Sequence, residues 1–224
     1  MKALIGCEYS GVVRDAFSAL GWDAWSCDVL PTESELTKQE GKHYQCDIFE
    51  VLYQDWDLLI AFPPCTYLTY AGMANWYDTG RAMKRIEAAK FFMQLWETPI
   101  PHICIENPRG IMTNIFRTPD MEIHPYYFGD KEMKRTCLWL KNLPLLKYQL
   151  ENDLFSERTA TDKPEPITIQ YRKKTGKIKR RYRTDYLFRY NKERSHLRSR
   201  FWPAIAKAMA EQWTEHLKNS KIWH

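Results

Sequence analysis

The stretch that decides the fold runs Trp56-Asp57-Leu58-Leu59-Ile60-Ala61-Phe62-Pro63-Pro64-Cys65-Thr66. Its apolar part, Leu58 to Phe62, is continuous, as expected of a strand buried on both faces of a parallel sheet. Pro63 and Pro64 lack the amide donor that a central strand needs, so the strand stops there. Cys65 is thereby presented just beyond the carboxyl end, at the edge where open α/β sheets bind ligands. A turn that holds an inert, buried cysteine would have the same local pattern.

Length and composition favour one α/β unit. The chain has 224 residues and is 44% hydrophobic, enough for a sizeable core. No apolar run approaches the length of a membrane span, and the first residues lack a signal-peptide pattern, so we expect a cytoplasmic protein without membrane contact. The six cysteines are scattered and include no Cys-x-x-Cys pair, which favours reduced thiols and no metal site.

Hydrophobic periodicity predicts a doubly wound, mostly parallel sheet with a late antiparallel hairpin strand. Ser10 is the expected N-cap of the first helix. In the helix at 81–98, apolar spacing assigns Met83 and Ile86 to the core. The expected strands are 2–7, 22–27, 44–46, 58–62, 102–105, 122–129 and 136–140; the expected helices are 12–20, 81–98, 109–116 and 201–217; 30–42 and 141–166 read as loops.

Three successive strand ends carry features of a nucleotide pocket. Gly6 and Gly11 flank a tight turn between the first strand and the first helix, where helix amides can meet a cofactor. Asp28 ends the second strand, and in doubly wound sheets an acid there commonly accepts hydrogen bonds from ribose hydroxyls. Asp47 ends the third. Each could be a plain turn or a solvated loop acid, but together they predict a cofactor pocket.

A second acid stands near Cys65. Glu106-Asn107-Pro108 follows the strand expected beside the Cys65 strand, although it could simply cap a helix. A thiolate that adds to carbon 6 of a pyrimidine makes carbon 5 nucleophilic toward an electrophilic methyl group. A partly protonated carboxyl group can donate to ring nitrogen 3, and a cation such as Arg135 can assist at the exocyclic oxygen.

The positive charge of the chain is concentrated in one segment. Between Tyr171 and Arg200 lie 13 Lys or Arg and two acids, a net +11, while the whole chain carries +5; the remainder therefore carries +5 minus +11, or −6. A mildly acidic body with one basic arm suggests a polyanionic partner. Part of this arm reads as a β-hairpin that turns at Thr175-Gly176.

These residues, in this order, resemble those of the cytosine-5 DNA methyltransferases, and the chain looks like a short, phage- or prophage-type member. Phe62-Pro63-Pro64-Cys65 matches the catalytic loop and Glu106-Asn107-Pro108 the Glu-Asn-Val type motif. The sequence from Lys134 to Leu140 resembles the strand with the catalytic arginine, and the last helix resembles one that returns to the cofactor unit. Departures are the missing Phe-x-Gly-x-Gly in the first turn, Thr66 in place of a common Gln, and a target-recognition region of about fifty residues.

The resemblance implies S-adenosyl-L-methionine as cofactor and DNA as substrate, with a flipped-out cytosine if the DNA is a duplex. It also implies three regions: a catalytic and cofactor-binding unit at 1–146, a small basic recognition segment at 147–195, and a returning helix at 196–224. The implied catalytic residues are Cys65, Glu106 and Arg135. The implied cofactor contacts are Gly6, Glu8, Tyr9, Ser10, Gly11, Asp28, Val29, Asp47, Ile48 and Pro64. The implied nucleic-acid contacts are Arg172, Lys173, Lys174, Lys177, Lys179, Arg180, Arg181 and Arg183.

Two alternatives stay open at the level of sequence. The same fold could act on RNA or a free pyrimidine nucleotide, or transfer another one-carbon group. The chain could instead be a nucleic-acid-binding protein in which Cys65 is inert. Host cytoplasm, bacterial or phage-infected, is the expected location, and the sequence does not fix the target site or the oligomeric state.

Overall fold

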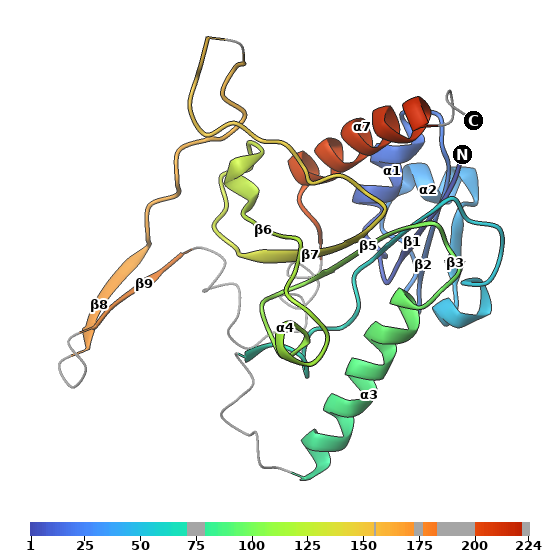
Figure 1. The fold of residues 1–224 in the computed structure, drawn as a ribbon, viewed down its shortest axis with the longest axis horizontal. Helices are drawn as coiled ribbons and strands as arrows, with labels where there is room; N and C mark the ends of the chain where they lie inside the picture. The colour runs from blue at the N-terminus through green and yellow to red at the C-terminus, as the bar shows by residue number, and fades with distance from the viewer. Residues whose placement is uncertain (71–78, 155, 173–176, 183–199, 221–224) are drawn as a thin grey trace.

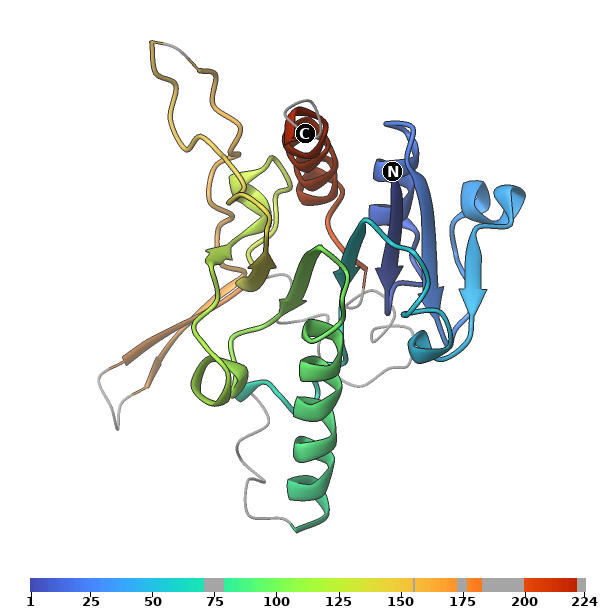
Figure 2. The same cartoon turned by 45° about the vertical axis from the view of Figure 1, so that its right-hand side comes forward.

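The computed structural model describes residues 1–70, 79–154, 156–172, 177–182 and 200–220. Its centre is a seven-stranded sheet in the order β3-β2-β1-β4-β5-β7-β6. Consecutive strands wind outward from β1 in both directions, and helices lie on both faces (Figures 1 and 2). The expected α/β class, a doubly wound and mostly parallel sheet with a late antiparallel strand, is confirmed.

The strands pair in parallel from β3 to β5, and β7 runs the other way. β7 is antiparallel to both of its neighbours, β5 and β6, as the sequence predicts for a late hairpin. The carboxyl ends of the five parallel strands therefore meet along one edge of the sheet. The strands span Lys2–Gly6 (β1), Asp23–Asp28 (β2), His43–Gln45 (β3), Leu58–Ala61 (β4), His102–Asn107 (β5), Met121–Ile123 (β6) and Thr136–Lys141 (β7).

Two hydrophobic clusters hold the helices to the sheet. On one face, α1 (Val12–Ser18) and α7 (Pro203–Ser220) pack together over the sheet, with Phe17, Met209 and Trp213 fully buried. On the other face, α3 (Thr79–Trp96) contributes Phe92 and Leu95. The helix expected at 201–217 is present, although it begins at Pro203, a residue suited to the first turn, and it buries Ile205 and Leu217. Within the described residues, no helix is long and apolar enough to cross a membrane.

The prediction for α3 is wrong in its first half. Met83 and Ile86 were assigned to the core by their spacing, but their side chains are 59% and 62% exposed. In Figures 1 and 2 the first turns of α3 project past the sheet, so no strand lies beneath them. Phe92, which is fully buried, lies on the opposite side of the helix from Met83, so the spacing of Met83 and Ile86 did not mark the buried face.

One helix was missed because its sequence is mostly polar. Residues 30–42 were expected to form a loop, yet they contain α2 (Glu35–Glu40). The Ser34 side chain accepts a hydrogen bond from the Thr37 amide, and Gly41 closes the helix with φ 64°. Both capping signals are legible in the sequence. Four further short or corrected elements are η1 (Ile48–Glu50), α4 (Met112–Ile115), β6 in place of a strand over 122–129, and η3 (Pro125–Tyr127).

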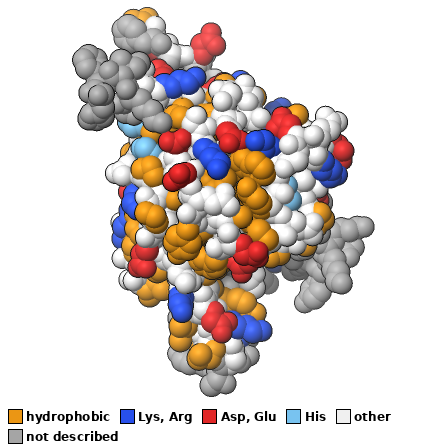
Figure 3. All heavy atoms as spheres, turned by 90° about the vertical axis from the view of Figure 1, so that its right-hand side faces the viewer, with side chains coloured by type: hydrophobic (Ala, Val, Ile, Leu, Met, Phe, Trp, Pro, Cys, Tyr) orange, Lys and Arg blue, Asp and Glu red, His pale blue; other side chains and the backbone are white. Residues whose placement is uncertain are grey.

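The edge at β3 is covered by side chains. Trp25 and Tyr44 stack with their ring centroids 4.6 Å apart, and the Lys42 ammonium lies 4.4 Å from the Trp25 ring. Figure 3, which looks at the molecule from the right-hand side of Figure 1, shows apolar side chains across the middle of this view among charges of both signs. β3 itself has only three residues, which limits the edge available for pairing with another chain.

The predicted basic hairpin is present as a separate two-stranded sheet. β8 (Thr168–Arg172) pairs antiparallel with β9 (Lys177–Arg181), so that Arg172 faces Lys177 in register. The turn expected at Thr175-Gly176 lies outside the described residues. In Figures 1 and 2 this hairpin stands away from the central sheet.

Candidate active site

The turn after β4 begins a tightly hydrogen-bonded loop. β4 ends at Ala61, and the two prolines carry the chain over the edge of the sheet. The Cys65 carbonyl then accepts hydrogen bonds from the Leu68 and Thr69 amides, each at 3.0 Å. Cys65 itself is half-buried, whereas Pro64 is exposed. The cysteine therefore occupies the first position of a fixed turn at the carboxyl end of a central strand.

The loop after β5 is attached directly to this turn. β5 is adjacent to β4 and runs through Glu106 to Asn107, both buried. The Asn107 side-chain amide donates to the Pro63 carbonyl at 2.8 Å. The Ile111 amide donates to the Leu68 carbonyl at 2.8 Å. The Phe-Pro-Pro-Cys turn and the Glu-Asn-Pro turn, forty residues apart in sequence, therefore form one unit at the same edge.

Glu106 is set up to be protonated near neutral pH. Burial raises its pKa to about 7, and the positive charge of Lys134 opposes this rise. The Thr136 hydroxyl donates to Oε1 of the carboxyl group. A carboxyl group with such a pKa can both hold and release a proton at the pH of a cell.

Arg135 is paired with Glu122 and not with Glu106. Its guanidinium lies 3.5 Å from one oxygen of Glu122, whose other oxygen is 3.7 Å from Arg109, and the Arg135 side chain is 50% exposed. The cation that acts on the Glu106 carboxyl is the preceding residue, Lys134. The arginine expected near the target base therefore belongs, in this structure, to an ion cluster with Glu122.

The first turn uses its own acid to hold the start of α1. The Glu8 carboxylate accepts hydrogen bonds from the Val13 and Arg14 amides at 2.8 and 3.3 Å, and the Ser10 hydroxyl donates to it at 3.0 Å. The N-cap residue is Gly11, with φ 75°, so the prediction that Ser10 would be the N-cap is wrong. Burial raises the pKa of Glu8 to about 7. Two helix amides that could have met a cofactor are engaged by Glu8.

The ends of β1, β2 and β3 converge. Cys7 directly follows β1 with a positive φ of 57°, and its thiol pKa is raised by burial and then by the charges of Asp28 and Asp47. Both carboxylates therefore lie near the end of β1. Asp28 accepts from the Leu30 amide at 2.9 Å, and Asp47 caps η1 through the Phe49 amide.

Gly6 shows how closely these strand ends approach. A Cβ atom at this position would lie 2.2 Å from Cδ1 of Ile48. Tyr9 is buried and its carbonyl accepts from the Glu33 amide, while Val29 is 70% exposed. The expected cofactor residues of the first three strands thus gather at one edge, and Val29 faces outward from it.

Sequence reasoning missed a segment that closes the site. The Phe201 ring packs on Phe62, with centroids 4.8 Å apart, and Trp202 follows it in the chain. The Lys134 ammonium lies 4.5 Å from the centroid of the Trp202 ring. Arg200 donates two hydrogen bonds to a Glu33 carboxylate oxygen at 2.9 and 2.6 Å. Two adjacent aromatic residues directly before the Pro203 helix start were the available signal.

The basic residues expected to contact nucleic acid are only partly described. Arg180 is exposed and Arg181 is half-buried on β9. Arg172 ends β8, and Lys177 and Lys179 lie on β9. Lys173, Lys174 and Arg183 lie outside the described residues. The same hairpin exposes Ile169, Tyr171 and Ile178.

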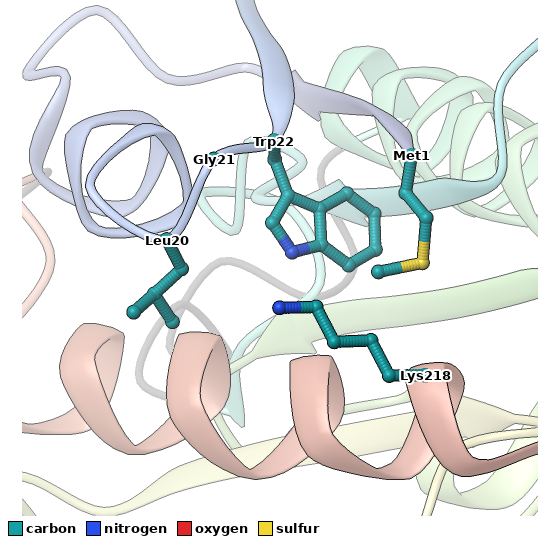
Figure 4. Close-up of a pocket in the computed structure, with 5 residues that line it drawn as sticks. All are labelled: Met1, Leu20, Gly21, Trp22 and Lys218. Carbon is teal, nitrogen blue, oxygen red and sulfur yellow. The ribbon is translucent and has the colours of Figure 1, made fainter.

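A cavity of about 270 Å³ lies elsewhere, at the amino-terminal edge of the sheet (Figure 4). It is lined by Met1, Leu20, Gly21, Trp22 and Lys218, with the Lys218 side chain reaching toward Trp22 from α7. β1 begins here, whereas the turns that hold Cys65 and Glu106 follow the opposite ends of their strands. We therefore place the candidate site at the carboxyl edge, where the chemically competent groups are, and not in this cavity.

No protein-family model matches the sequence, and no curated protein matches it. Among solved structures, a protein described as a prophage-encoded DNA modification methyltransferase of E. coli has 13% identity and a TM-score of 0.41, over 62% of this chain and 46% of that one. The Entamoeba histolytica methyltransferase EhMeth has 13% identity and a TM-score of 0.41, over 75% of this chain and 58% of that one. The chain thus spans about half the length of these structures. A likeness of this size does not assign an activity.

Proposed function

We propose that the protein transfers a methyl group from S-adenosyl-L-methionine to carbon 5 of cytosine in DNA, through a covalent adduct between Cys65 and carbon 6. One observation carries this proposal: the hydrogen bond from the Asn107 side chain to the Pro63 carbonyl, which ties the cysteine turn to the turn of the buried acid. The two reacting groups that the chemistry requires thus come from adjoining loops at the ligand-binding edge of the sheet.

Within this proposal, the Cys65 thiolate adds to carbon 6 while the protonated Glu106 carboxyl donates to ring nitrogen 3. The electron pair displaced from the ring double bond then makes carbon 5 nucleophilic. After carbon 5 has gained the methyl group, with S-adenosylhomocysteine as the leaving product, loss of the carbon 5 proton to a base restores the double bond and expels the thiolate, while nitrogen 3 returns its proton to Glu106. The pKa of about 7 for Glu106 suits a group that must give and regain a proton.

The residues at the ends of β1 to β3 fit the proposed cofactor. Asp28 and Asp47 gather near Cys7, and carboxylates there can accept hydrogen bonds from ribose hydroxyls and an adenine amino group. Gly6 lies where a side chain would meet Ile48, and the positive φ of Gly11 shapes the turn. Glu8 and Ser10 act by holding this turn. When bound, S-adenosylmethionine supplies an electrophilic methyl group on a positively charged sulfur.

For DNA, the proposal uses the basic arm as the contact to the phosphate backbone. In its terms, residues 1–146 form the catalytic and cofactor unit, 147–195 the recognition segment, and 196–224 the returning helix. A duplex target would be flipped out of the stack toward Cys65. Phosphate contacts alone give affinity that falls with salt and little sequence reading, so we expect a short or loosely defined target sequence.

A second candidate is the same chemistry on RNA or a free pyrimidine nucleotide. It is favoured by the short stretch of about fifty residues between Leu146 and His196, in which little space remains for reading a duplex sequence. A non-catalytic nucleic-acid-binding protein is the third candidate, and it requires Cys65 to have no role in any reaction.

The test is incubation with methyl-labelled S-adenosylmethionine and, separately, duplex DNA, RNA and dCMP, followed by nucleoside analysis. Label in 5-methyldeoxycytidine from DNA supports the proposal; label from RNA or dCMP alone would replace the substrate. Duplex DNA containing 5-fluorocytosine should trap the protein covalently. Cys65→Ala should abolish both the product and the trap, whereas Cys46→Ala, a substitution of another half-buried cysteine, should retain them. Binding without label or trap would favour the third candidate.

A further inference from the structure

A chain of contacts links the cysteine turn to the turn before β7, and Lys134 is one of its members. The Phe62 ring packs on Phe201, and Phe201 packs on Trp202. Trp202 carries the Lys134 ammonium on its face. The Asn107–Pro63 hydrogen bond ties the same cysteine turn to the end of β5.

The position of Lys134 is fixed from several directions. Thr136, two residues later and fully buried in β7, donates to Glu106. The start of α7 is held by the Ala204 amide, which donates to Asp130 at 2.9 Å in the turn that contains Lys134. Cation–π contact with an indole ring favours one place for an otherwise flexible ammonium group. These contacts therefore hold Lys134 in one position near Glu106.

The titratable and hydroxyl side chains that face the Glu106 carboxyl from β5 and β7 are uncharged. From β5, Cys104 faces it, and from β7, Thr136 does, whereas Cys137 pairs with Asn107 and lies on the other face of the sheet. Burial raises the pKa of Cys104 well above its ordinary value and that of Cys137 to about 12, so both thiols keep their protons at neutral pH. Trp202 contributes an uncharged ring. Among the groups named here, Lys134 is the ionised one, and Arg135 is engaged with Glu122.

We propose that Lys134, held on the Trp202 ring, is the positioning residue that controls the Glu106 carboxyl, and that Arg135 does not have this role. Its part in a reaction rests on the proposed function; its action on Glu106 does not. The ammonium favours the ionised carboxylate, so it eases release of the proton. Lys134 thereby sets the pH at which Glu106 changes from proton donor to acceptor.

The test reads the carboxyl group directly, in the protein without cofactor or nucleic acid. Glutamate labelled with ¹³C at the side-chain carboxyl gives one NMR signal per residue, and the signal that disappears in Glu106→Gln is that of Glu106. Titration should show an apparent pKa that is higher in Lys134→Gln than in the wild type by about one unit. Lys134→Arg should restore the wild-type value. Arg135→Gln, a matched loss of one charge at the next residue, should leave it within experimental error.

Trp202→Leu provides a second variant that keeps both charges. Loss of the ring should free the ammonium and raise the pKa of Glu106 part of the way toward the Lys134→Gln value. A rise in Arg135→Gln with no change in Lys134→Gln would overturn the inference, as would titration curves that coincide in all variants. Because no methyl transfer is measured, an inactive protein with the expected pKa changes would count against the proposed function alone.

Discussion

The Asn107 side chain donates to the Pro63 carbonyl at 2.8 Å, joining the ends of two adjacent strands. Asn107 is 1% exposed, and its second polar atom, Oδ1, has no hydrogen-bond partner in the described part of the chain. A buried acceptor without a donor is costly and is uncommon in folded proteins. At this edge of the sheet the Asn107 side chain anchors the cysteine turn.

Asn107→Ala should therefore loosen the cysteine turn. The substitution leaves the Pro63 carbonyl without its donor, and we expect a loss of about 1–3 kcal/mol in unfolding free energy. The rate of covalent trapping on 5-fluorocytosine DNA should fall further than this loss of stability explains. Chemical denaturation and trapping kinetics measure the two effects. Asn114→Ala, at an exposed position of α4, is the matched control, and an equal effect in both variants would contradict the assigned role.

Gly110 and Gly6 both lie where a side chain would clash, but Gly110 faces a backbone atom and Gly6 faces a side chain. A Cβ at Gly110 would lie 2.0 Å from the Leu68 carbonyl oxygen, whereas one at Gly6 would meet the end of the Ile48 side chain. Gly110→Ala should thus displace the loop that follows Cys65 and reduce both trapping and thermal stability. Gly6→Ala should be rescued by Ile48→Val, which removes the clashing Cδ1 atom. Thermal unfolding of the single and double variants tests this, and failure of the rescue would show a different constraint at Gly6.

Local signals were sufficient for most of the fold. The Leu58–Phe62 run followed by two prolines could only be a central strand that stops, and the order of strands and helices then left few topologies. The helix at 35–40 could also have been found, from Ser34 and Gly41, had capping been weighted above polarity. The exposure of Met83 could not, because tertiary packing decides which side of α3 meets the sheet, and Phe92 on the opposite side is the buried residue.

The sequence predicts at which edge of the sheet the site lies, but it does not predict the side-chain contacts within the site. Acids at strand ends can be counted in a sequence, but which of two adjacent cations faces Glu106 depends on the turn before β7 and on Trp202, some seventy residues away. The same holds for Glu8, which was expected at a cofactor and whose carboxylate holds helix amides of its own turn. Pairings that depend on three-dimensional register leave no periodic signal.

Stability should fall as the pH rises from about 4.5 to about 7, because two buried carboxyl groups have raised pKa values. Burial raises the pKa of both Glu8 and Glu106 from 4.5 to about 7. Below about pH 4.5 each group is protonated in the folded and the unfolded chain; as the pH rises to 7 the unfolded chain loses its protons first and becomes favoured. Each group should cost on the order of 1–3 kcal/mol over this range.

Glu106→Gln removes one of these titrations and should flatten the decline between pH 4.5 and 7. Urea denaturation at several pH values measures the unfolding free energy of the wild type and the variant. Glu35→Gln, at an exposed position in the first turn of α2, is the control and should preserve the wild-type profile. Parallel profiles for wild type and Glu106→Gln would mean that Glu106 titrates at its ordinary value.

Substitution of Asp28 should test cofactor binding more directly than substitution of Asp47. Asp47 also caps η1, in a capping box with Glu50, so its loss combines a binding effect with a structural one. Asp28→Asn should weaken binding of S-adenosylhomocysteine by roughly tenfold, on the basis of one or two lost charge-assisted hydrogen bonds. Isothermal titration calorimetry measures this, with Asp23→Asn, at the opposite end of β2, as the control. Equal affinities for Asp28→Asn and the wild type would remove Asp28 from the proposed pocket.

The hairpin should contribute charge-dependent affinity for nucleic acid. Arg180 is exposed on β9, and Tyr171 and Ile178 face each other in register with exposed side chains. If the basic residues contact phosphates, each contact removed should lower the slope of log affinity against log salt concentration by about 0.9 on duplex DNA. The combined change Lys177→Gln, Lys179→Gln and Arg180→Gln should therefore give a shallower slope in fluorescence anisotropy titrations.

Tyr171→Ala should instead weaken binding at every salt concentration with an unchanged slope, because stacking or apolar contact releases no counterions. Lys207→Gln removes one positive charge from an exposed position on α7, far along the chain from the hairpin, and should change neither quantity. If it reduces the slope as much as one hairpin substitution does, the affinity arises from net charge and the hairpin has no special place in it. An unchanged slope in the triple variant would direct the search to basic residues outside this hairpin.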